Sequence, residues 1–261
     1  MATLDVPKHL QRGRHRSDDD WEASALALLG LLAETFDRPD LSATSLLDVG
    51  CGTKLTKVIL EQEVPIGRYV GVDTAGDIID FLTANVDDAR FSFHHLDAHN
   101  DLYNPQGRPL ESYDRLPIGD DTFDIVSLFS VFTHLAPHDY RAMLEVLRPH
   151  VAPEGGLLFS LFVDQGVPPE HREAFERELH RRRDAGDPAV LRALEARAAA
   201  EAAGEPLIAD FVDAVPDRPL LEAVYSERYA RELIEGSGWE AVALHAPRRP
   251  FIQHYFVCRP V

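Results

Sequence analysis

The residues with the clearest capacity for chemistry form a glycine turn that follows an apolar run. The segment 46–52 reads LLDVGCG, in which Asp48 precedes Gly50 and Gly52. Glycine lets the backbone approach a ligand closely, and the free N–H groups at the start of a following helix can bind it. The third glycine of a dinucleotide-binding G-x-G-x-x-G pattern is missing, because position 55 is Leu55. A carboxylate at Asp48 would repel a pyrophosphate and suits an ammonium group, so the turn favours a phosphate-free adenosyl ligand over NAD.

Two further carboxylates close the next two predicted strands. Asp73 stands where a carboxylate can accept hydrogen bonds from both hydroxyls of a ribose, and the alternative is a helix cap for the segment after Thr74. Asp97 can accept a hydrogen bond from an adenine amino group, while the Ala98 N–H donates to a ring nitrogen. An Asx-turn is the competing interpretation of Asp97.

Strands that alternate with helices must position these residues. Apolar and alternating patterns predict strands over 45–49, 68–73, 90–96, 123–129 and 156–163, and helices over 21–36, 53–61, 78–84, 139–147 and 226–236. Segments 240–245 and 252–257 predict a terminal antiparallel hairpin. The expected fold is a doubly wound, mostly parallel α/β sheet of seven strands with a helical insertion.

The chain divides into three parts by composition. Residues 1–43 are an N-terminal arm and helix, in which 1–20 are expected to be a loose arm and Asp20 to cap the helix. Residues 44–261 form the main domain. Within it, the charged stretch 165–220 is a helical insertion that suits a lid over the site or a contact in a homodimer.

Composition narrows the partners and the compartment. The net charge of -18 argues against a nucleic-acid partner, whose phosphates usually meet a basic face. The two cysteines, Cys51 and Cys258, form no disulfide framework, which fits a reducing cytoplasm. No apolar run reaches the roughly 18 residues that a membrane span needs, and the polar N-terminus is not a secretory signal. We therefore expect a cytoplasmic protein with no membrane partner.

Taken together, the motifs closely resemble those of the class I S-adenosylmethionine-dependent methyltransferases, a Rossmann-like family. The resemblance covers about 44–164 and again 226–258, with motifs at 46–52, 69–73, 95–98, 121–126, 147–149 and 154–157. Within the family, the chain resembles a bacterial branch that carries YNPxG and SVFTHL segments, here 103–107 and 130–135.

The resemblance implies S-adenosylmethionine as the cofactor and assigns a role to each motif residue. The methionine portion and ribose would be held by the first motif, the ribose hydroxyls and adenine by the next two, and the sulfonium side by the end of the fourth strand. In that order the residues are Asp48, Gly50, Cys51 and Gly52; Asp73 with Thr74; Asp97 and Ala98; and Leu128 and Phe129.

Lys54 stands where the family often has a third glycine. A lysine in the first turn of a helix opposes the helix dipole. Two interpretations follow: the ammonium compensates by meeting the cofactor carboxylate, or it is a solvated side chain that points away.

Methyl transfer from a sulfonium is an in-line displacement, so the protein mainly aligns the two reactants. A base is needed only where the acceptor must lose a proton. His134, after the fourth strand, is the candidate base or orienting group, and packing against the adjacent helix is the alternative. Tyr103 and Tyr140 are further pocket candidates. The spacing of His94, His95 and His99 places no three ligands on one face of a regular element, so we expect no metal.

The acceptor is expected to be a small molecule with an oxygen or nitrogen nucleophile, such as a natural product, a sugar or an amine. The segment 128–131 reads LFSV, not the Asp/Asn-Pro-Pro-aromatic run of exocyclic-amine methylation, and neither cysteine is placed for attack on cytosine. Two alternatives remain: a cofactor-binding partner protein without catalysis, and aminopropyl transfer from a decarboxylated cofactor on the same fold.

Overall fold

The central strand of the sheet is β1 (Leu41–Val49), which pairs in parallel with β2 (Ile66–Asp73) on one side and β4 (Phe123–Leu128) on the other. The computed structural model describes residues 3–11, 18–164, 184, 186, 210–214, 218–247 and 253–261. Beyond these strands lie β3 (Phe91–His95) and β5 (Val151–Asp164), giving the order β3-β2-β1-β4-β5. The winding reverses at β1, and ligands of such sheets bind outside the carboxyl ends of the strands at this switch point.

The C-terminal strands complete the sheet as predicted, and two short strands add to it. β9 (His254–Pro260) pairs antiparallel with both β5 and β8 (Trp239–His245), which confirms the terminal hairpin. β6 (Phe211–Asp213) and β7 (Ala223–Ser226) were not predicted, and β7 pairs with the end of β5. The sheet in the described part of the chain therefore has nine strands rather than seven. Strands of three and four residues are too short to show an alternating pattern.

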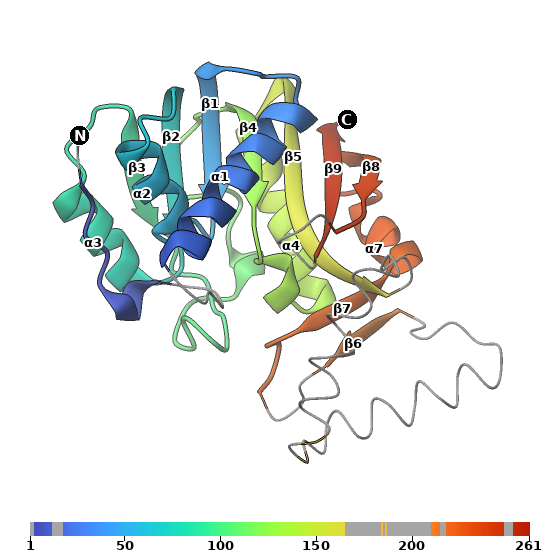
Figure 1. Cartoon of the computed structure of the whole chain (residues 1–261). Helices are drawn as coiled ribbons and strands as arrows, with labels where there is room; N and C mark the ends of the chain where they lie inside the picture. Colours follow the sequence, from blue (N-terminus) through green and yellow to red (C-terminus); the bar gives the residue numbers. More distant parts are fainter. Residues whose placement is uncertain are drawn as a thin grey trace.

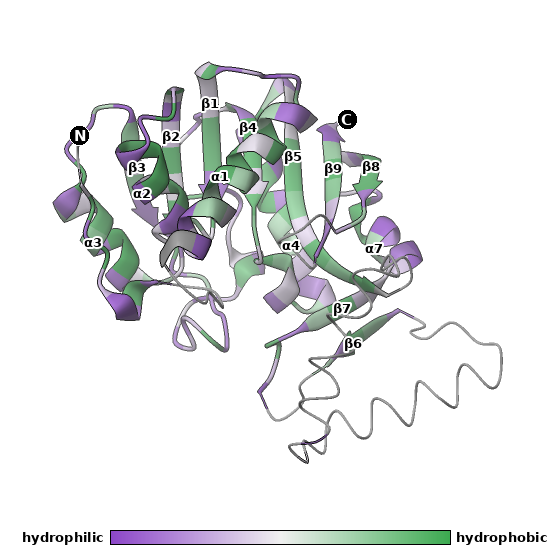
Figure 2. Ribbon diagram, viewed as in Figure 1, coloured by the Kyte–Doolittle hydropathy of each residue, from purple (hydrophilic) through white to green (hydrophobic). Residues whose placement is uncertain are grey.

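Helices cover both faces of the sheet, as the doubly wound prediction requires (Figure 1). Leu46 packs in one buried cluster with α1 (Asp18–Thr35) and α2 (Lys54–Glu61). Its neighbour Leu47 packs in another with α4 (Pro137–Leu147) and α7 (Glu227–Ile234). Successive residues of a strand point to opposite faces, so a strand buried on both sides is apolar throughout. Figure 2 shows that the central strands are mostly, though not entirely, apolar.

The helix starts differ slightly from the prediction. α1 begins at Asp18, so Asp20 lies in its first turn and is not the cap. A carboxylate in a first turn still interacts favourably with the helix dipole. α3 (Gly76–Asn85) follows β2 and packs on β3.

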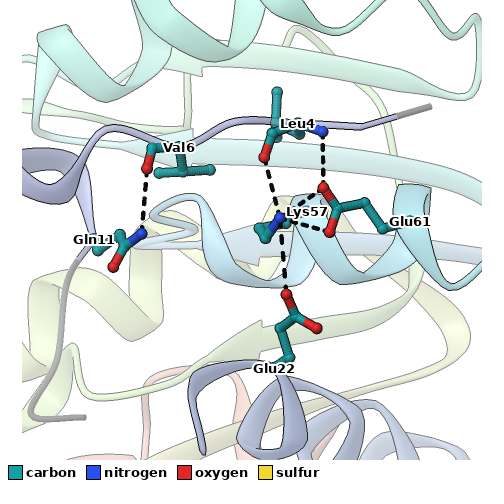
Figure 3. A network of polar contacts seen from close by, with 6 residues as sticks. All are labelled: Leu4, Val6, Gln11, Glu22, Lys57 and Glu61. Atoms are coloured by element: carbon teal, nitrogen blue, oxygen red, sulfur yellow. Dashed lines mark hydrogen bonds and ion pairs between the residues drawn. The ribbon is translucent and has the colours of Figure 1, made fainter. Parts of the chain in front are cut away.

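Residues 3–11 are packed against the domain, so the expectation of a loose arm is wrong for them. Leu4, Val6 and Leu10 are buried in a cluster with Trp21 and residues of α3. The Lys57 ammonium donates to the Leu4 carbonyl at 3.2 Å and pairs with Glu61, whose carboxylate accepts from the Leu4 N–H (Figure 3). Three apolar side chains spaced among polar ones were enough to anchor the segment.

The same N-terminal segment reaches the glycine turn. The Thr53 hydroxyl, at the start of α2, donates to the Leu10 carbonyl at 3.3 Å. The N-terminal segment therefore supports the helix that begins directly after Gly52.

Most of the insertion expected over 165–220 lies outside the described residues, so its lid or dimer role stays a prediction. Within the ranges that are described, no helix combines the length and apolar character needed to cross a membrane.

Leu10→Ala is expected to lower the free energy of unfolding by about 2–4 kcal/mol, because it removes a buried side chain and leaves a cavity. Leu26→Ala on α1 is the matched control, since Leu26 is 44% exposed, and its effect should stay within about 0.5 kcal/mol. Urea unfolding of both variants measures the difference. Equal effects would show that the N-terminal segment contributes nothing to stability.

Candidate functional site

The glycine turn that the sequence predicted follows β1, and its backbone conformation is one that favours glycine. Gly50 and Gly52 have φ values of 72° and 50°, which L side chains rarely adopt. A Cβ atom on Gly50 would collide with Cγ2 of Val131, in the loop after β4. A Cβ on Gly52 would meet nothing within 4 Å, so this residue faces open space. The turn thus brings the loops after β1 and β4 together and leaves backbone exposed beside them.

Asp73, at the end of β2, fixes the turn from the other side. One carboxylate oxygen accepts a hydrogen bond from the Gly52 N–H at 2.9 Å, and the other accepts from the Ala75 N–H at 2.9 Å. Ala75 is the residue before α3. The carboxylate therefore joins the glycine turn to the residue before α3, but it is not the cap of this helix, whose N-cap residue is Ala75 and has no side-chain cap hydrogen bond.

A cavity of about 1040 Å³ opens at these strand ends. Seven of the eleven predicted site residues line it: Gly50, Gly52, Asp73, Thr74, Ala98, Phe129 and His134. Lys54 and Tyr103 lie on the same wall. The cavity thus coincides with the switch point of the sheet, where the winding rule places a ligand.

Three predicted residues are buried behind the wall. The Asp48 carboxylate accepts hydrogen bonds from the Tyr69 hydroxyl at 2.8 Å and the Ser127 hydroxyl at 2.9 Å. Burial raises the pKa of Asp48 to about 7, although these two hydroxyls act to lower it. Cys51 packs toward Gly71, and Leu128 lies in the core. None of these three residues lines the cavity, so their side chains are not placed to contact a cofactor bound there.

The adenine residues also differ in detail from the prediction. The Asp97 side chain is exposed and off the cavity wall, and it accepts from the Asn104 amide at 3.0 Å. The Ala98 N–H donates to the Leu96 carbonyl at 2.7 Å in a tight turn, so it is already engaged within the chain. Asn104 also donates to the Ala98 carbonyl at 3.2 Å. This explains the YNPxG segment physically: it anchors the turn that forms the cavity wall.

His134 lies on the wall and is largely buried, with its ring edge-on to Tyr103 at 5.8 Å between centroids. Its Nδ1 lies 3.1 Å from the Leu220 carbonyl oxygen. Because a carbonyl only accepts, Nδ1 carries the hydrogen, and the lone pair of the neutral ring is on Nε2. Burial lowers the pKa of His134, and the carbonyls of Leu220 and Leu221 oppose that shift. The ring is therefore neutral at pH 7 and has the protonation state of a base.

Lys54 is largely buried on the wall beside Gly52. Its Nζ donates to the Ser24 hydroxyl of α1 at 3.1 Å. Burial lowers the pKa of this ammonium to about 8. The interpretation as a solvated lysine that points away is therefore wrong.

Several residues of the wall were missed by sequence reasoning. They come from β5, from the β6–β7 connection and from the residue before β9: Phe162, Leu221, Glu222 and Gln253. The β6–β7 pair was not predicted, so no sequence pattern pointed to Leu221 or Glu222. Ser130, the first residue of the SVFTHL segment that the sequence singled out, also lines the cavity.

The remaining pocket candidate, Tyr140, lies away from the cavity wall. Tyr140 is fully buried among aromatic rings of the core and does not line the cavity. In the part of the chain that the structure describes, no three His, Cys, Asp or Glu side chains form a metal-binding group.

Residues 19–208 match the model of a family described as a methyltransferase domain. The match covers well over half of the sequence, and the chain therefore belongs to the methyltransferase domain family. The finer resemblance to a bacterial branch stays a prediction.

Solved structures with the same fold are distant in sequence. Magnesium protoporphyrin IX methyltransferase (ChlM) from Synechocystis PCC 6803 with bound SAH is 11% identical, with a TM-score of 0.53 over 97% of this chain and 92% of that one. The mitomycin 7-O-methyltransferase MmcR is 15% identical, with a TM-score of 0.52 over 95% and 59%. LepI in complex with SAH and a substrate analogue is 14% identical, with a TM-score of 0.51 over 97% and 50%. The chain thus spans about half the length of LepI, and at these identities the likeness establishes the fold.

The depressed pKa of Lys54 predicts a pH-dependent stability. The folded state binds this proton more weakly than the unfolded chain, so the lysine destabilises the fold fully below about pH 8 and ceases to do so as the pH rises toward 10.5. Lys54→Met is expected to raise the free energy of unfolding by about 1–3 kcal/mol at pH 7 and by less at pH 9.5. Denaturant unfolding at both pH values measures this, with Lys8→Met, at an exposed position, as the control. A gain independent of pH would contradict the assignment.

Proposed function

We propose that the chain binds S-adenosylmethionine and transfers its methyl group to a small-molecule acceptor through an oxygen or nitrogen nucleophile. The observation that carries the proposal is the single cavity that joins the glycine turn to His134. Ligand sites usually measure roughly 300–1,000 Å³, so a cavity of about 1040 Å³ has room for a cofactor and an acceptor together. The fold shared with ChlM and MmcR, both named as methyltransferases, supports this reading.

The cofactor fits the end of the cavity formed by β1 and β2. Exposed backbone at Gly52 leaves space for the methionyl portion, and the Asp73 carboxylate would accept hydrogen bonds from ribose hydroxyls. Leu96, Ala98 and Ile78 supply apolar surface for the adenine. When bound, the cofactor supplies an electrophilic methyl carbon; the protein needs to align it with the acceptor.

The acceptor fits the end formed by the loop after β4 and the β6–β7 connection. Its apolar lining suits the body of a small molecule: Val131, Leu135, Met143 and Phe162. His134 would accept at Nε2 the proton that a hydroxyl or amine releases as its bond to the methyl carbon forms and the bond from that carbon to sulfur breaks, with S-adenosylhomocysteine as the leaving group.

Asp73→Ala is expected to weaken S-adenosylmethionine binding by about 1–3 kcal/mol, the scale of a lost hydrogen bond to a charged group. Isothermal titration measures the affinity, and Asp77→Ala, an exposed carboxylate on α3, is the matched control. Thermal unfolding checks that the turn held by Asp73 remains folded. Unchanged affinity would show that the ribose lies elsewhere, and a wild-type protein that binds no cofactor would contradict the proposed function.

His134→Ala is expected to lower turnover by about 10²–10⁴-fold, the usual contribution of a general base, with cofactor affinity unchanged. The assay follows S-adenosylhomocysteine formation over a panel of small hydroxyl and amine acceptors. The wild-type rate should rise with pH through a pKa below 6.5, and the variant should lose that rise. His138→Ala, exposed on α4, is the control. Full activity of His134→Ala would make it a packing residue, and cofactor binding without turnover on any acceptor would favour a non-catalytic partner protein.

A further inference from the structure

One cation on the wall of the cavity has no counter-charge among the described residues. Among the described residues that line it, Lys54 is the only lysine or arginine, whereas Asp20, Asp73 and Glu222 are carboxylates. Its Nζ makes one hydrogen bond, to the neutral Ser24 hydroxyl, and forms no ion pair with any described carboxylate. A buried charge without a partner is costly to a fold. The chain has 44 acidic and 26 basic residues, so the missing partner does not reflect a shortage of carboxylates.

Neither the stability of α2 nor packing in the core accounts for a lysine at position 54. It is the first residue of α2, where a cation opposes the helix dipole. Lys57, one turn later on the same helix, contrasts with it, because Lys57 pairs with Glu61 and Glu22 (Figure 3). The fold thus neutralises one lysine of α2 and leaves the other facing the cavity.

Ser24 holds the ammonium in place. Its hydroxyl donates to the Trp21 carbonyl at 2.7 Å within α1, so the lone pairs of its oxygen remain for Lys54. Trp21 is buried, which fixes this part of α1. The Lys54 side chain is therefore oriented between α1 and the glycine turn before any ligand arrives.

We propose that Lys54 binds the carboxylate at the methionyl end of the cofactor, with Ser24 as a positioning residue. The inference rests on the proposed function. S-adenosylmethionine has one anionic group, at the end opposite its adenine. Lys54 adjoins Gly52 on the α1–α2 wall, whereas the acceptor end is built by the loop after β4 and the β6–β7 connection. A cation on the α1–α2 wall therefore contacts the cofactor and not the acceptor.

The assignment gives the site a selectivity. A decarboxylated cofactor keeps its ammonium and loses the group that Lys54 would bind, so the lysine repels it. Aminopropyl transfer, which uses that form, is accordingly disfavoured. On this assignment, Lys54 replaces the family's third glycine because it binds the cofactor carboxylate, and the replacement does not weaken the cofactor site.

The test compares two ligands that differ in the carboxylate. S-adenosylhomocysteine carries it, and S-adenosyl-3-thiopropylamine lacks it and keeps the ammonium. Isothermal titration should show that Lys54→Met weakens S-adenosylhomocysteine binding by about 10- to 100-fold, the factor for a hydrogen bond between charged groups. Binding of the thiopropylamine should stay unchanged or become tighter. Ser24→Ala should shift the same ratio in the same direction by a smaller factor.

The control and the remaining outcomes separate the two proposals. Lys8→Met removes a charge at an exposed position and should leave both affinities unchanged. Equal losses for both ligands in Lys54→Met would show a structural role for the lysine, and no loss for either would show no contact; both results overturn the inference and leave cofactor binding intact. A wild-type protein that binds neither ligand overturns the proposed function and the inference with it. Thermal unfolding of Lys54→Met confirms that the variant is folded.

Discussion

A buried carboxylate at the centre of the sheet holds together the strands that carry the site. Asp48 on β1 accepts hydrogen bonds from Tyr69 on β2 and from Ser127 on β4. These are the strands on either side of the switch point, and their parallel register places Leu47 beside both Val70 and Val126. The three strands consequently end together, and the glycine turn follows Asp48 in the sequence by two residues. The loops that follow these strands depend on this register for their positions.

Two ionisable groups a few residues apart, Asp48 and Lys54, differ in how the fold surrounds them. Asp48 is satisfied by two hydroxyls from neighbouring strands, and its pKa is raised to about 7 by burial. Lys54 is oriented by one neutral hydroxyl, and burial lowers its pKa to about 8. Hydroxyl donors can replace much of the hydration of a carboxylate, whereas a single acceptor replaces little of that of an ammonium. The fold itself supplies the hydrogen-bond partners of Asp48. By our proposal, Lys54 obtains a counter-charge only when an anion binds.

The sequence predicted the strands other than β6 and β7, the turn and the cavity-lining glycines because each depends on local pattern. Long buried strands are apolar on both faces, and a glycine turn between strand and helix is readable in one dimension. The direction of the Asp48 side chain cannot be read from the sequence in the same way. One step along a strand reverses the face to which a side chain points, and no pattern identifies the hydroxyls of the neighbouring strands. The engagement of the Ala98 N–H also escaped prediction, because the tight turn that uses it is fixed by Asn104 from another part of the loop.

Two residues with strained backbone show that the proposed acceptor end of the cavity is held by different strands from the cofactor end. Ser130 and Leu220 have φ values of 60° and 55°, unfavourable for residues other than glycine. Each is held by a side chain: the Ser130 N–H donates to the Ser160 hydroxyl, and the Leu220 N–H donates to the Asp213 carboxylate of β6. The Leu220 carbonyl in turn sets which nitrogen of His134 carries the hydrogen. The proposed base thus depends on β6 and β7, whereas the cofactor end depends on β1, β2 and β4. Because the two ends rest on different strands, a substitution in the β6–β7 connection can change one end of the cavity while leaving the glycine turn and Asp73 unchanged.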